Sequence, residues 1–359
     1  MTDEPREHSG TAPASPDPQS ARPAGKILRR ILGAAVVVLL LGAGIVWWQA
    51  QQLLFRPVTF AQPRTVVVQR RATWSKVAQQ LEAERIIPSA FALRVYARLH
   101  HQDSGLKVGE YELSGKMTPV QILELLNSGR VVSYWLTIPE GKWASEMGAL
   151  LEPRWPEAAG EFAELVRQPD LFRDRVKFPL EGGSLEGYLF PNTYLVSKGA
   201  NAPQIITGML QTFEQQCWQA YQQNRPQDGR SFYEVLILAS LIEAEARVPA
   251  ERPIIAGVYI NRMRKNMLLQ CDATVLYAHR KRLSRVLYRD LEIDSRYNTY
   301  RYPGLPVGPI CNPGAASFLA ALKPREVTYL YYVAKGDGSH VFTNTLAEHA
   351  AAIRQIRGK

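Results

Sequence analysis

Two acidic residues, Glu243 and Glu245, directly follow the apolar run VLILASLI in the second half of the chain. Burial of a carboxyl group disfavours its charged form and raises its pKa, so the group can act as a general acid near neutral pH. The other interpretation is that one or both acids form structural ion pairs with nearby Arg247, Arg252 or Arg262. The residues alone leave both interpretations open.

A helix with well-marked ends carries these two acids. Ser231 and Glu234 form the S-x-x-E pattern of a capping box, and Pro249 stops the helix soon after Glu245. Apolar residues cover every side of it, which is typical of a buried helix. At 100° per residue, Glu243 and Glu245 lie roughly 160° apart around the axis and cannot form one paired-carboxylate site.

Three segments downstream have a clear character. Residues 251–266 have the apolar spacing of a second helix, and residues 297–314 are rich in Gly, Pro, aromatic and polar side chains, which predicts a long ordered loop. The C-terminal run TYLYYVAKGDGSHVFTNTLAEH predicts a hairpin about its Gly-Asp-Gly turn. His340 and His349 lack the HExxH spacing of a zinc helix, so we expect no metal.

The first part after the N-terminal tail predicts a small α/β unit. Strand patterns at 65–69 and 109–113 enclose helical patterns at 74–84 and 90–100, and a third helix follows with Thr118 as N-cap, Pro119 at its start and Gly129 as its terminator. This β-α-α-β order resembles a LysM-like module, a class that binds N-acetylated glycans. The alternative is a small domain that only packs on its neighbour.

The N-terminus predicts a membrane anchor. Residues 1–25 lack a hydrophobic period and should be disordered, whereas residues 31–48 are an uncharged apolar run of about 18 residues, long enough to cross a bilayer. Lys26, Arg29 and Arg30 precede the run and Trp47 and Trp48 close it, which indicates a cytoplasmic N-terminus. A cleaved signal peptide is the alternative, but the tail is long and no A-x-A site follows the run.

Composition sets broad limits. The chain has 359 residues, enough for two compact units plus appendages, with 46% hydrophobic and 21% charged residues as in a globular protein. The net charge of +10 indicates an anionic partner or membrane surface. Cys217, Cys271 and Cys311 form no C-x-x-C metal motif, and a Cys271–Cys311 disulfide is compatible with their number.

In order and spacing, the chain strongly resembles the endolytic murein transglycosylase (YceG-like) family, through the segments LASLIEAEA, ERPIIAGVYINRM, LQCDATVLYA, YNTYRYPGLPVGPICNPG and YLYYVAKGDGSHVFTNTLAEH. The resemblance covers essentially everything after the tail. It implies an inner-membrane protein with one N-terminal span, a LysM-like subdomain and a periplasmic catalytic domain that cuts nascent peptidoglycan strands internally.

The resemblance also implies a mechanism. The second glutamate of the family's E-x-E motif is catalytic, which corresponds to Glu245 and leaves Glu243 as a secondary residue without an assigned role. Such an enzyme uses no water, because the C6 hydroxyl of N-acetylmuramic acid attacks the anomeric carbon and forms a 1,6-anhydro end. A single carboxyl group therefore suffices, first as general acid and then as general base.

Matches to the family's motifs select further residues that would bind substrate and stabilise oxocarbenium charge. They are Gln270, Asp272, Thr274, Tyr297 and Asn298, together with Glu186 and Tyr188 from EGYLFPNTY. In that motif Asn192 replaces the aspartate typical of the family, which weakens any electrostatic role there. No cofactor is expected.

The sequence thus predicts an α+β protein with a single N-terminal transmembrane helix, a LysM-like small α/β subdomain and a mixed α+β catalytic domain. The predicted boundaries are 1–25 for a disordered cytoplasmic tail, 26–50 for the anchor, 63–131 for the LysM-like subdomain and 132–359 for the catalytic domain. Expected partners are peptidoglycan strands, the inner membrane and peptidoglycan synthases, with no nucleic acid. A hydrolase on the same fold and a non-catalytic, glycan-binding scaffold remain alternatives.

Overall fold

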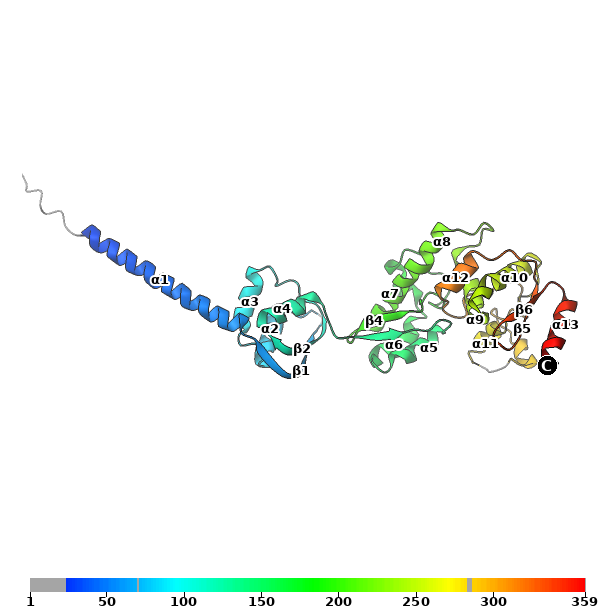
Figure 1. Ribbon diagram of the computed structural model, residues 1–359, viewed down its shortest axis with the longest axis horizontal. Helices are drawn as coiled ribbons and strands as arrows, with labels where there is room; N and C mark the ends of the chain where they lie inside the picture. Colours follow the sequence, from blue (N-terminus) through cyan, green and yellow to red (C-terminus); the bar gives the residue numbers. More distant parts are fainter. Residues whose placement is uncertain (1–23, 70, 283–285, 359) are drawn as a thin grey trace, which may run out of the picture. The chain divides into compact units, whose positions relative to one another are not determined.

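The computed structural model describes residues 24–69, 71–282 and 286–358, so nearly all of the tail expected to be disordered lies outside the described residues (Figure 1). The chain divides into two compact units. The first comprises the chain up to residue 64 with residues 70–107 and 113–129, and the second comprises residues 65–69, 108–112 and 130–359.

The first unit begins with one long helix, α1 (Ala24–Phe55). Its segment Arg29–Phe55 is long and apolar enough to cross a membrane, and residues 29–49 are all exposed to solvent in the isolated chain. The apolar run expected at 31–48 therefore lies inside a continuous helix. This is compatible with a single-pass membrane anchor.

The strand and helix order of the following part agrees with the β-α-α-β order expected from the sequence. Its elements are β1 (Val58–Val68), α2 (Trp74–Ala83), α3 (Ala90–Leu99), β2 (Gly109–Met117) and α4 (Pro119–Ser128). The strands β1 and β2 are neighbours in a two-stranded sheet. Thr118 caps α4 in a capping box with Gln121, and Gly129 ends the helix with a left-handed φ of 72°, as the sequence predicts.

The second unit is built mainly from helices. Its regular elements are β3 (Ser133–Thr137), α5 (Ala144–Leu151), α6 (Pro156–Leu165), β4 (Thr193–Ser197), α7 (Ala202–Phe213), α8 (Gln219–Gln223), α9 (Phe232–Glu245), α10 (Arg252–Arg264), α11 (Asp272–Ala278), α12 (Ala315–Leu322), β5 (Tyr331–Ala334), β6 (His340–Thr343) and α13 (Leu346–Arg357). The strands form two antiparallel pairs, β3 with β4 and β5 with β6. The predicted C-terminal hairpin is thereby confirmed, whereas α13 was not predicted.

Helix α9 forms the centre of this unit. Residues 235–242 are all buried, and the helix packs against α12, α10 and α11 (Figure 1). Ser231 caps it in a capping box with Glu234, and Ala246 leaves the helical conformation, so both predicted ends are confirmed. The prediction of a buried helix is confirmed as well, since apolar neighbours surround it on every side.

Two further predictions can be compared with the structure. Residues 297–314 contain neither a helix nor a strand and are largely buried, as expected for an ordered loop. The Cys271–Cys311 disulfide is wrong, because all three cysteines are free and buried. The Cys271 thiol contacts Glu245, whereas the Cys311 thiol contacts the carbonyl of Ser240, so the two sulfur atoms serve different sites.

Candidate active site

Glu245 is the last residue of α9, at the point where the buried helix reaches the surface. The residue is partly exposed and its neighbour Ala244 is exposed, although the preceding turns are buried. The Cys271 thiol donates a hydrogen bond to its Oε1 at 3.1 Å. A carboxylate here also faces the negative end of the helix dipole, which disfavours the charged form.

The surroundings raise the pKa of Glu245, and desolvation by burial is the main cause. The charge of Asp272 raises it further, while the Cys271 thiol, the charge of His340 and the Tyr332 hydroxyl oppose the shift. The net result is a carboxyl group that retains its proton at a higher pH than an exposed glutamate does. A general acid for work near neutral pH requires this property.

A buried tyrosine and a partly buried one lie near this carboxyl group. Tyr259 on α10 and Tyr332 on β5 share a hydrogen bond of 2.9 Å between their hydroxyl groups. Burial raises the pKa of both, and the nearby Glu245 adds to the effect. They therefore remain neutral, and Glu245 lies among neutral hydroxyl and thiol groups.

A histidine–carboxylate pair lies near Glu245. The backbone N–H of His340 donates to Glu251 Oε1 at 3.0 Å, and its Nδ1 lies 2.7 Å from Glu251 Oε2. These two contacts fix the imidazole at the start of β6. No local sequence pattern predicts this pair, because the two residues are 89 positions apart.

Glu243 has a different environment, and the ion-pair interpretation is confirmed for it. Its side chain is only 7% exposed and its Oε1 lies 3.7 Å from Arg252 Nη2. Its Oε2 accepts a hydrogen bond of 3.0 Å from the backbone N–H of Gly314. Arg252 is held in place by the Ser317 hydroxyl at 3.0 Å, and Glu140 lies near the same guanidinium. Glu243 thus joins α9 to α10 and to the start of α12.

Of the predicted substrate-binding residues, Gln270 and Asp272 lie beside the Glu245 partner Cys271 and are exposed. Gln270 has a left-handed φ of 53°, and its side chain accepts a hydrogen bond from Arg262 at 3.3 Å. Asp272 begins α11 and accepts a hydrogen bond of 2.5 Å from the Tyr300 hydroxyl. A role in binding substrate stays a prediction for both residues.

Thr274 and Asn298 are fully buried in this structure, and a role in binding substrate stays a prediction for both. Thr274 donates to the carbonyl of Cys271 at 2.7 Å and bonds with the Thr299 hydroxyl at 2.9 Å. Asn298 donates to two main-chain carbonyls and accepts from the backbone N–H of Tyr300 at 3.0 Å. Both therefore fix the loop that carries Tyr300.

Tyr297 is half-buried, with its ring 4.9 Å from that of Tyr277. A role in binding substrate stays a prediction for it.

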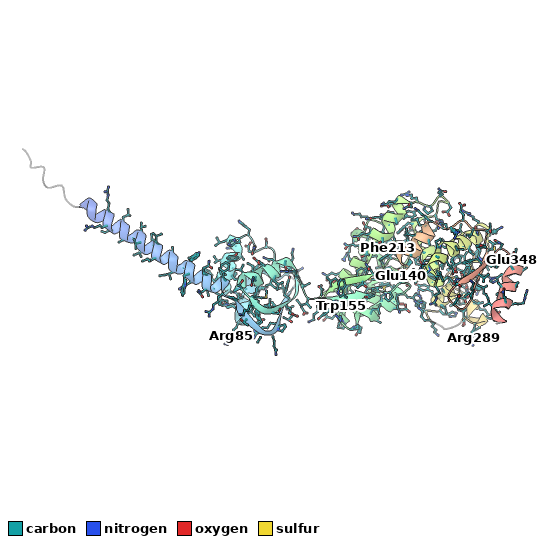
Figure 2. The ribbon with its side chains drawn as sticks, in the orientation of Figure 1. Arg85, Glu140, Trp155, Phe213, Arg289 and Glu348 are labelled. Carbon is teal, nitrogen blue, oxygen red and sulfur yellow. The ribbon has the colours of Figure 1, made fainter. Side chains whose placement is uncertain are left out.

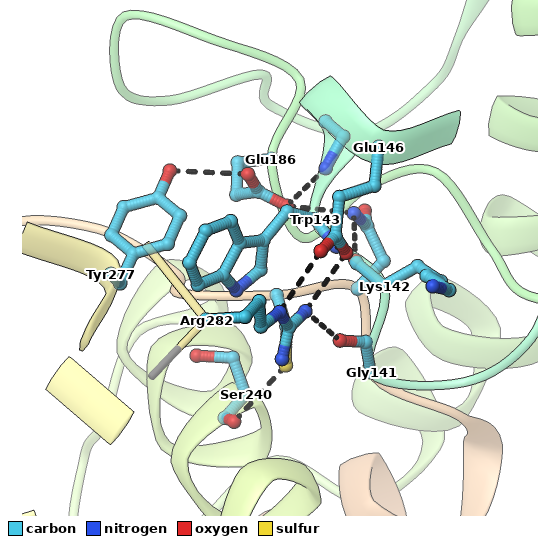
Figure 3. Close-up of polar contacts among 11 residues, drawn as sticks. Gly141, Lys142, Trp143, Glu146, Glu186, Ser240, Tyr277 and Arg282 are labelled. Carbon is cyan, nitrogen blue, oxygen red and sulfur yellow. Dashed lines mark hydrogen bonds and ion pairs between the residues drawn. The ribbon is translucent and has the colours of Figure 1, made fainter. Parts of the chain in front are cut away.

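Glu186 is also buried, with only 5% of the residue exposed, and its contact with substrate stays a prediction. Its carboxyl group accepts hydrogen bonds from Ala144 N at 3.0 Å, Asn312 Nδ2 at 2.7 Å and the Tyr277 hydroxyl at 3.1 Å (Figure 3). Burial raises its pKa to about 7. Glu186 thus connects α5, the 297–314 loop and α11.

Tyr188 is part of the hydrophobic core of the second unit. It is 0% exposed, and its ring packs against Phe178, Phe213 and Tyr233. Phe213 lies in the second unit (Figure 2). The Tyr188 hydroxyl bonds with the main chain of Glu181. A motif match does not reveal which way a side chain points, so a role of Tyr188 in binding substrate stays a prediction.

Helix α10 fixes the segment that leads into β5 and Tyr332. Asn261 donates to the carbonyls of Val327 and Tyr329 at 2.7 and 3.1 Å, and Arg262 donates to the carbonyl of Leu330 at 2.7 Å. Gly257 allows this close approach, since a Cβ atom there would lie 2.4 Å from the carbonyl oxygen of Arg325. The Tyr259–Tyr332 pair depends on this alignment.

A surface hollow of about 810 Å³ lies between the 224–230 loop, α10 and residues 322–328. It contains none of the predicted site residues. Among groups of His, Cys, Asp and Glu in the described part of the chain, none has the arrangement of a metal site.

The architecture and the site together define a protein of mixed helices and strands with a partly exposed general-acid candidate at the end of a buried helix. Residues 66–355 match the YceG-like family, and the chain belongs to this family.

Relatives support the assignment. An endolytic murein transglycosylase from Bacillus subtilis is 37% identical over 297 residues, which cover 77% of this chain and 80% of the relative. One from Streptococcus pneumoniae is 27% identical over 314 residues, which cover 79% of this chain and 57% of the relative. A crystal structure of a putative YceG-like protein from Listeria monocytogenes has a TM-score of 0.56 and 33% identity, covering 81% of this chain and 99% of that one.

Proposed function

We propose that this protein is a lytic transglycosylase that cleaves peptidoglycan glycan strands internally, with Glu245 as its single acid–base catalyst. The observation that supports this most is the raised pKa of a partly exposed carboxyl group among neutral hydroxyl and thiol groups. The curated relatives are named endolytic murein transglycosylases, which supports the same substrate class.

In the proposed reaction, protonated Glu245 gives its proton to the glycosidic oxygen between N-acetylmuramic acid and N-acetylglucosamine. The bond from that oxygen to the anomeric carbon of the muramic acid breaks. The C6 hydroxyl of the same sugar attacks the anomeric carbon, and the Glu245 carboxylate accepts the hydroxyl proton. The proton on Glu245 is restored, no water is consumed, and a 1,6-anhydro end is formed.

Exposed polar residues next to Cys271 would bind the sugars. Gln270 and Asp272 are the two candidates closest in the chain to that cysteine, and the Tyr300 hydroxyl orients Asp272. Developing positive charge at the anomeric carbon would be stabilised by the Asp272 carboxylate. Thr274, Asn298 and Glu186 act from inside the protein by holding these segments in place.

The N-terminal part would bring this site to its substrate. We propose that α1 is a single-pass inner-membrane anchor with a cytoplasmic N-terminus and that the rest of the chain is periplasmic. The β-α-α-β part, proposed to be LysM-like, would position glycan strands. Cleavage next to the membrane would terminate strands as peptidoglycan synthases extend them, because tethering raises the local concentration of site and substrate.

Product analysis tests the proposal. The full-length protein in detergent should release muropeptides with 1,6-anhydro ends from purified sacculi, as measured by mass spectrometry. Products heavier by one water would contradict it in favour of a hydrolase, which adds water at the broken bond. Sacculi that bind the protein but release nothing would favour the non-catalytic scaffold.

A further inference from the structure

The folded part of the first unit begins to cover α1 immediately after its apolar run. Residues 29–49 of the helix are exposed, whereas Ala50 and Gln51 are partly covered and Leu54 is buried. Ala50 lies only two residues beyond Trp48, the end of the apolar run, which is a rise of about 3 Å. The headgroup layer on each side of a bilayer is about 5–8 Å thick. The folded part therefore starts within that layer if α1 spans the membrane.

Helix α3 is one of the two helices of this unit that pack against α1 (Figure 1). The contact includes Phe55, the last residue of α1, whose ring meets that of Tyr96 edge-on at 5.9 Å. Ala90, Leu93 and Ala97 form the buried face of α3. Tyr96 thus lies at the edge of α3 that faces the anchor.

The solvent side of α3 next to Tyr96 is apolar. Phe91, Val95 and Leu99 recur at every fourth position and are 74%, 41% and 72% exposed. Such spacing places them in one stripe roughly 80° wide, and Tyr96 lies roughly 60° beyond Leu99. The stripe is therefore continuous with the edge that contacts α1. A surface helix of an ordinary soluble domain carries polar side chains on this face.

Basic side chains border the stripe on its other side. Arg94 and Arg98 are exposed and lie within roughly 60° of Phe91 around the helix. Asp103 lies 3.9 Å from Arg98, and both of these side chains are largely open to solvent. An apolar stripe bordered by arginine is typical of a helix that lies in the membrane interface, where arginine reaches the lipid phosphates.

We propose that α3 lies in the membrane interface beside the anchor, with Phe91, Val95 and Leu99 inserted at the boundary of headgroups and acyl chains. Arg94 and Arg98 then contact lipid phosphates. This inference rests on the proposed membrane anchor. The lipid surface is the occupant that the contact with α1 favours, because the stripe continues from the edge of α3 that contacts Phe55, the last residue of the candidate membrane span. Insertion of both α1 and α3 then fixes the tilt of the first unit relative to the membrane.

Depth measurements in lipid test this arrangement. The full-length protein, reconstituted in liposomes that contain lipids with a quencher at known depths, carries a fluorescent label on one introduced cysteine. Its three native cysteines are buried, so they react little, and the unmodified protein serves as the blank. The labelled positions are Leu99→Cys on α3, Val46→Cys in the apolar run and Gln79→Cys on α2.

Shallow quenchers should reduce the fluorescence of a label at position 99 severalfold more than that of a label at position 79. Deep quenchers should reduce the fluorescence of a label at position 46. If position 46 is quenched but position 99 behaves like position 79, the inference is overturned and the anchor stands. If position 46 is not quenched, the anchor itself fails. A label at position 99 that is shielded from solvent in protein freed of both lipid and detergent, but not in liposomes, would contradict the proposal. It would instead indicate that a protein or a glycan covers the stripe.

Matched variants sharpen the result. Phe91→Ser in the Leu99→Cys protein should reduce quenching at position 99 severalfold, because the stripe loses its largest apolar group. Leu171→Ser, a similar change at a 53% exposed position of the second unit, should leave it unchanged. Arg94→Gln with Arg98→Gln should weaken the dependence of quenching on anionic lipid. Equal quenching in all these variants would contradict the proposal.

Discussion

The two carboxyl groups at the end of α9 are two residues apart, yet the protein surrounds them with opposite kinds of partners. Glu243 meets a guanidinium and a backbone N–H, both of which favour a carboxylate. Glu245 meets a thiol and neutral tyrosine hydroxyls, and burial there favours the protonated acid. About half a helix turn thus separates a carboxyl group in an ion pair from one with a raised pKa, and their partners rather than their positions in the helix make this difference.

The largest expected effect comes from neutralising each acid in turn. Glu245→Gln keeps the shape but cannot donate a proton, so the rate of anhydro-muropeptide release should fall about 10²- to 10⁴-fold. Glu243→Gln, the matched control, still accepts from Gly314 and should keep most of the rate per folded molecule. Equal losses in both variants would show that the comparison of the two sites is mistaken.

The next effect concerns stability. Glu243→Ala leaves Arg252 without its buried acid and the Gly314 N–H without an acceptor, so the free energy of unfolding should fall by about 3 kcal/mol. Chemical denaturation measures this change in the free energy of unfolding. The double variant Glu243→Met with Arg252→Met should recover part of the loss, because it removes both charges. A double variant less stable than Glu243→Ala would mean that Arg252 stabilises the fold by other contacts.

Glu186 extends the comparison of Glu243 with Glu245, because its pKa is raised although its carboxyl group is buried. Its pKa is about 7 in the folded protein against 4.5 for an ordinary glutamate. The folded state therefore holds the proton more tightly, and this contribution to stability is full below pH 4.5 and lost as pH rises through about 7. The loss should be at most about 3 kcal/mol.

Glu186→Gln imitates the neutral acid and should flatten this decline in denaturation experiments between pH 4.5 and 7. Glu146 has a pKa lowered by the hydrogen bond from Arg282, in opposition to desolvation, so its titration falls below that window. Glu146→Gln removes a charge that raises the pKa of Glu186, so this variant should reduce the decline without abolishing it. An unchanged slope in Glu186→Gln would exclude Glu186 as its source.

The smallest effects should be opposite shifts in the pH profile of the reaction. Asp272 raises the pKa of Glu245, so Asp272→Asn should move the alkaline loss of kcat/KM to lower pH. Positive charge on His340 lowers that pKa, so His340→Gln should move the loss to higher pH. Shifts in the same direction would show that Glu245 does not control the alkaline side of the profile.

Local signals in the sequence predicted elements well. The capping box of Ser231 and Glu234 and the Thr118 to Gly129 helix were read correctly, because caps and terminators act within a few residues. Helix α13 has a similar box from Thr345 and Glu348, a local signal from which this helix could also have been predicted.

The site could be predicted only in part. Glu245 came from resemblance to a family, since helix geometry does not distinguish it from Glu243. Tyr188, Thr274 and Asn298 match the same motifs but point into the protein, and only tertiary packing determines that direction. The contact between Glu251 and His340 joins residues far apart in the chain, so no local pattern reveals it.

The contacts from α10 to the segment before β5 have one more consequence. Asn261 and Arg262 hold that segment through carbonyl oxygens of Val327, Tyr329 and Leu330, and every residue type has such an oxygen. Homologues should therefore accept many different side chains at these three positions. A one-residue insertion or deletion there would move Tyr332 out of register with Glu245, so the length of this segment should hardly vary during evolution.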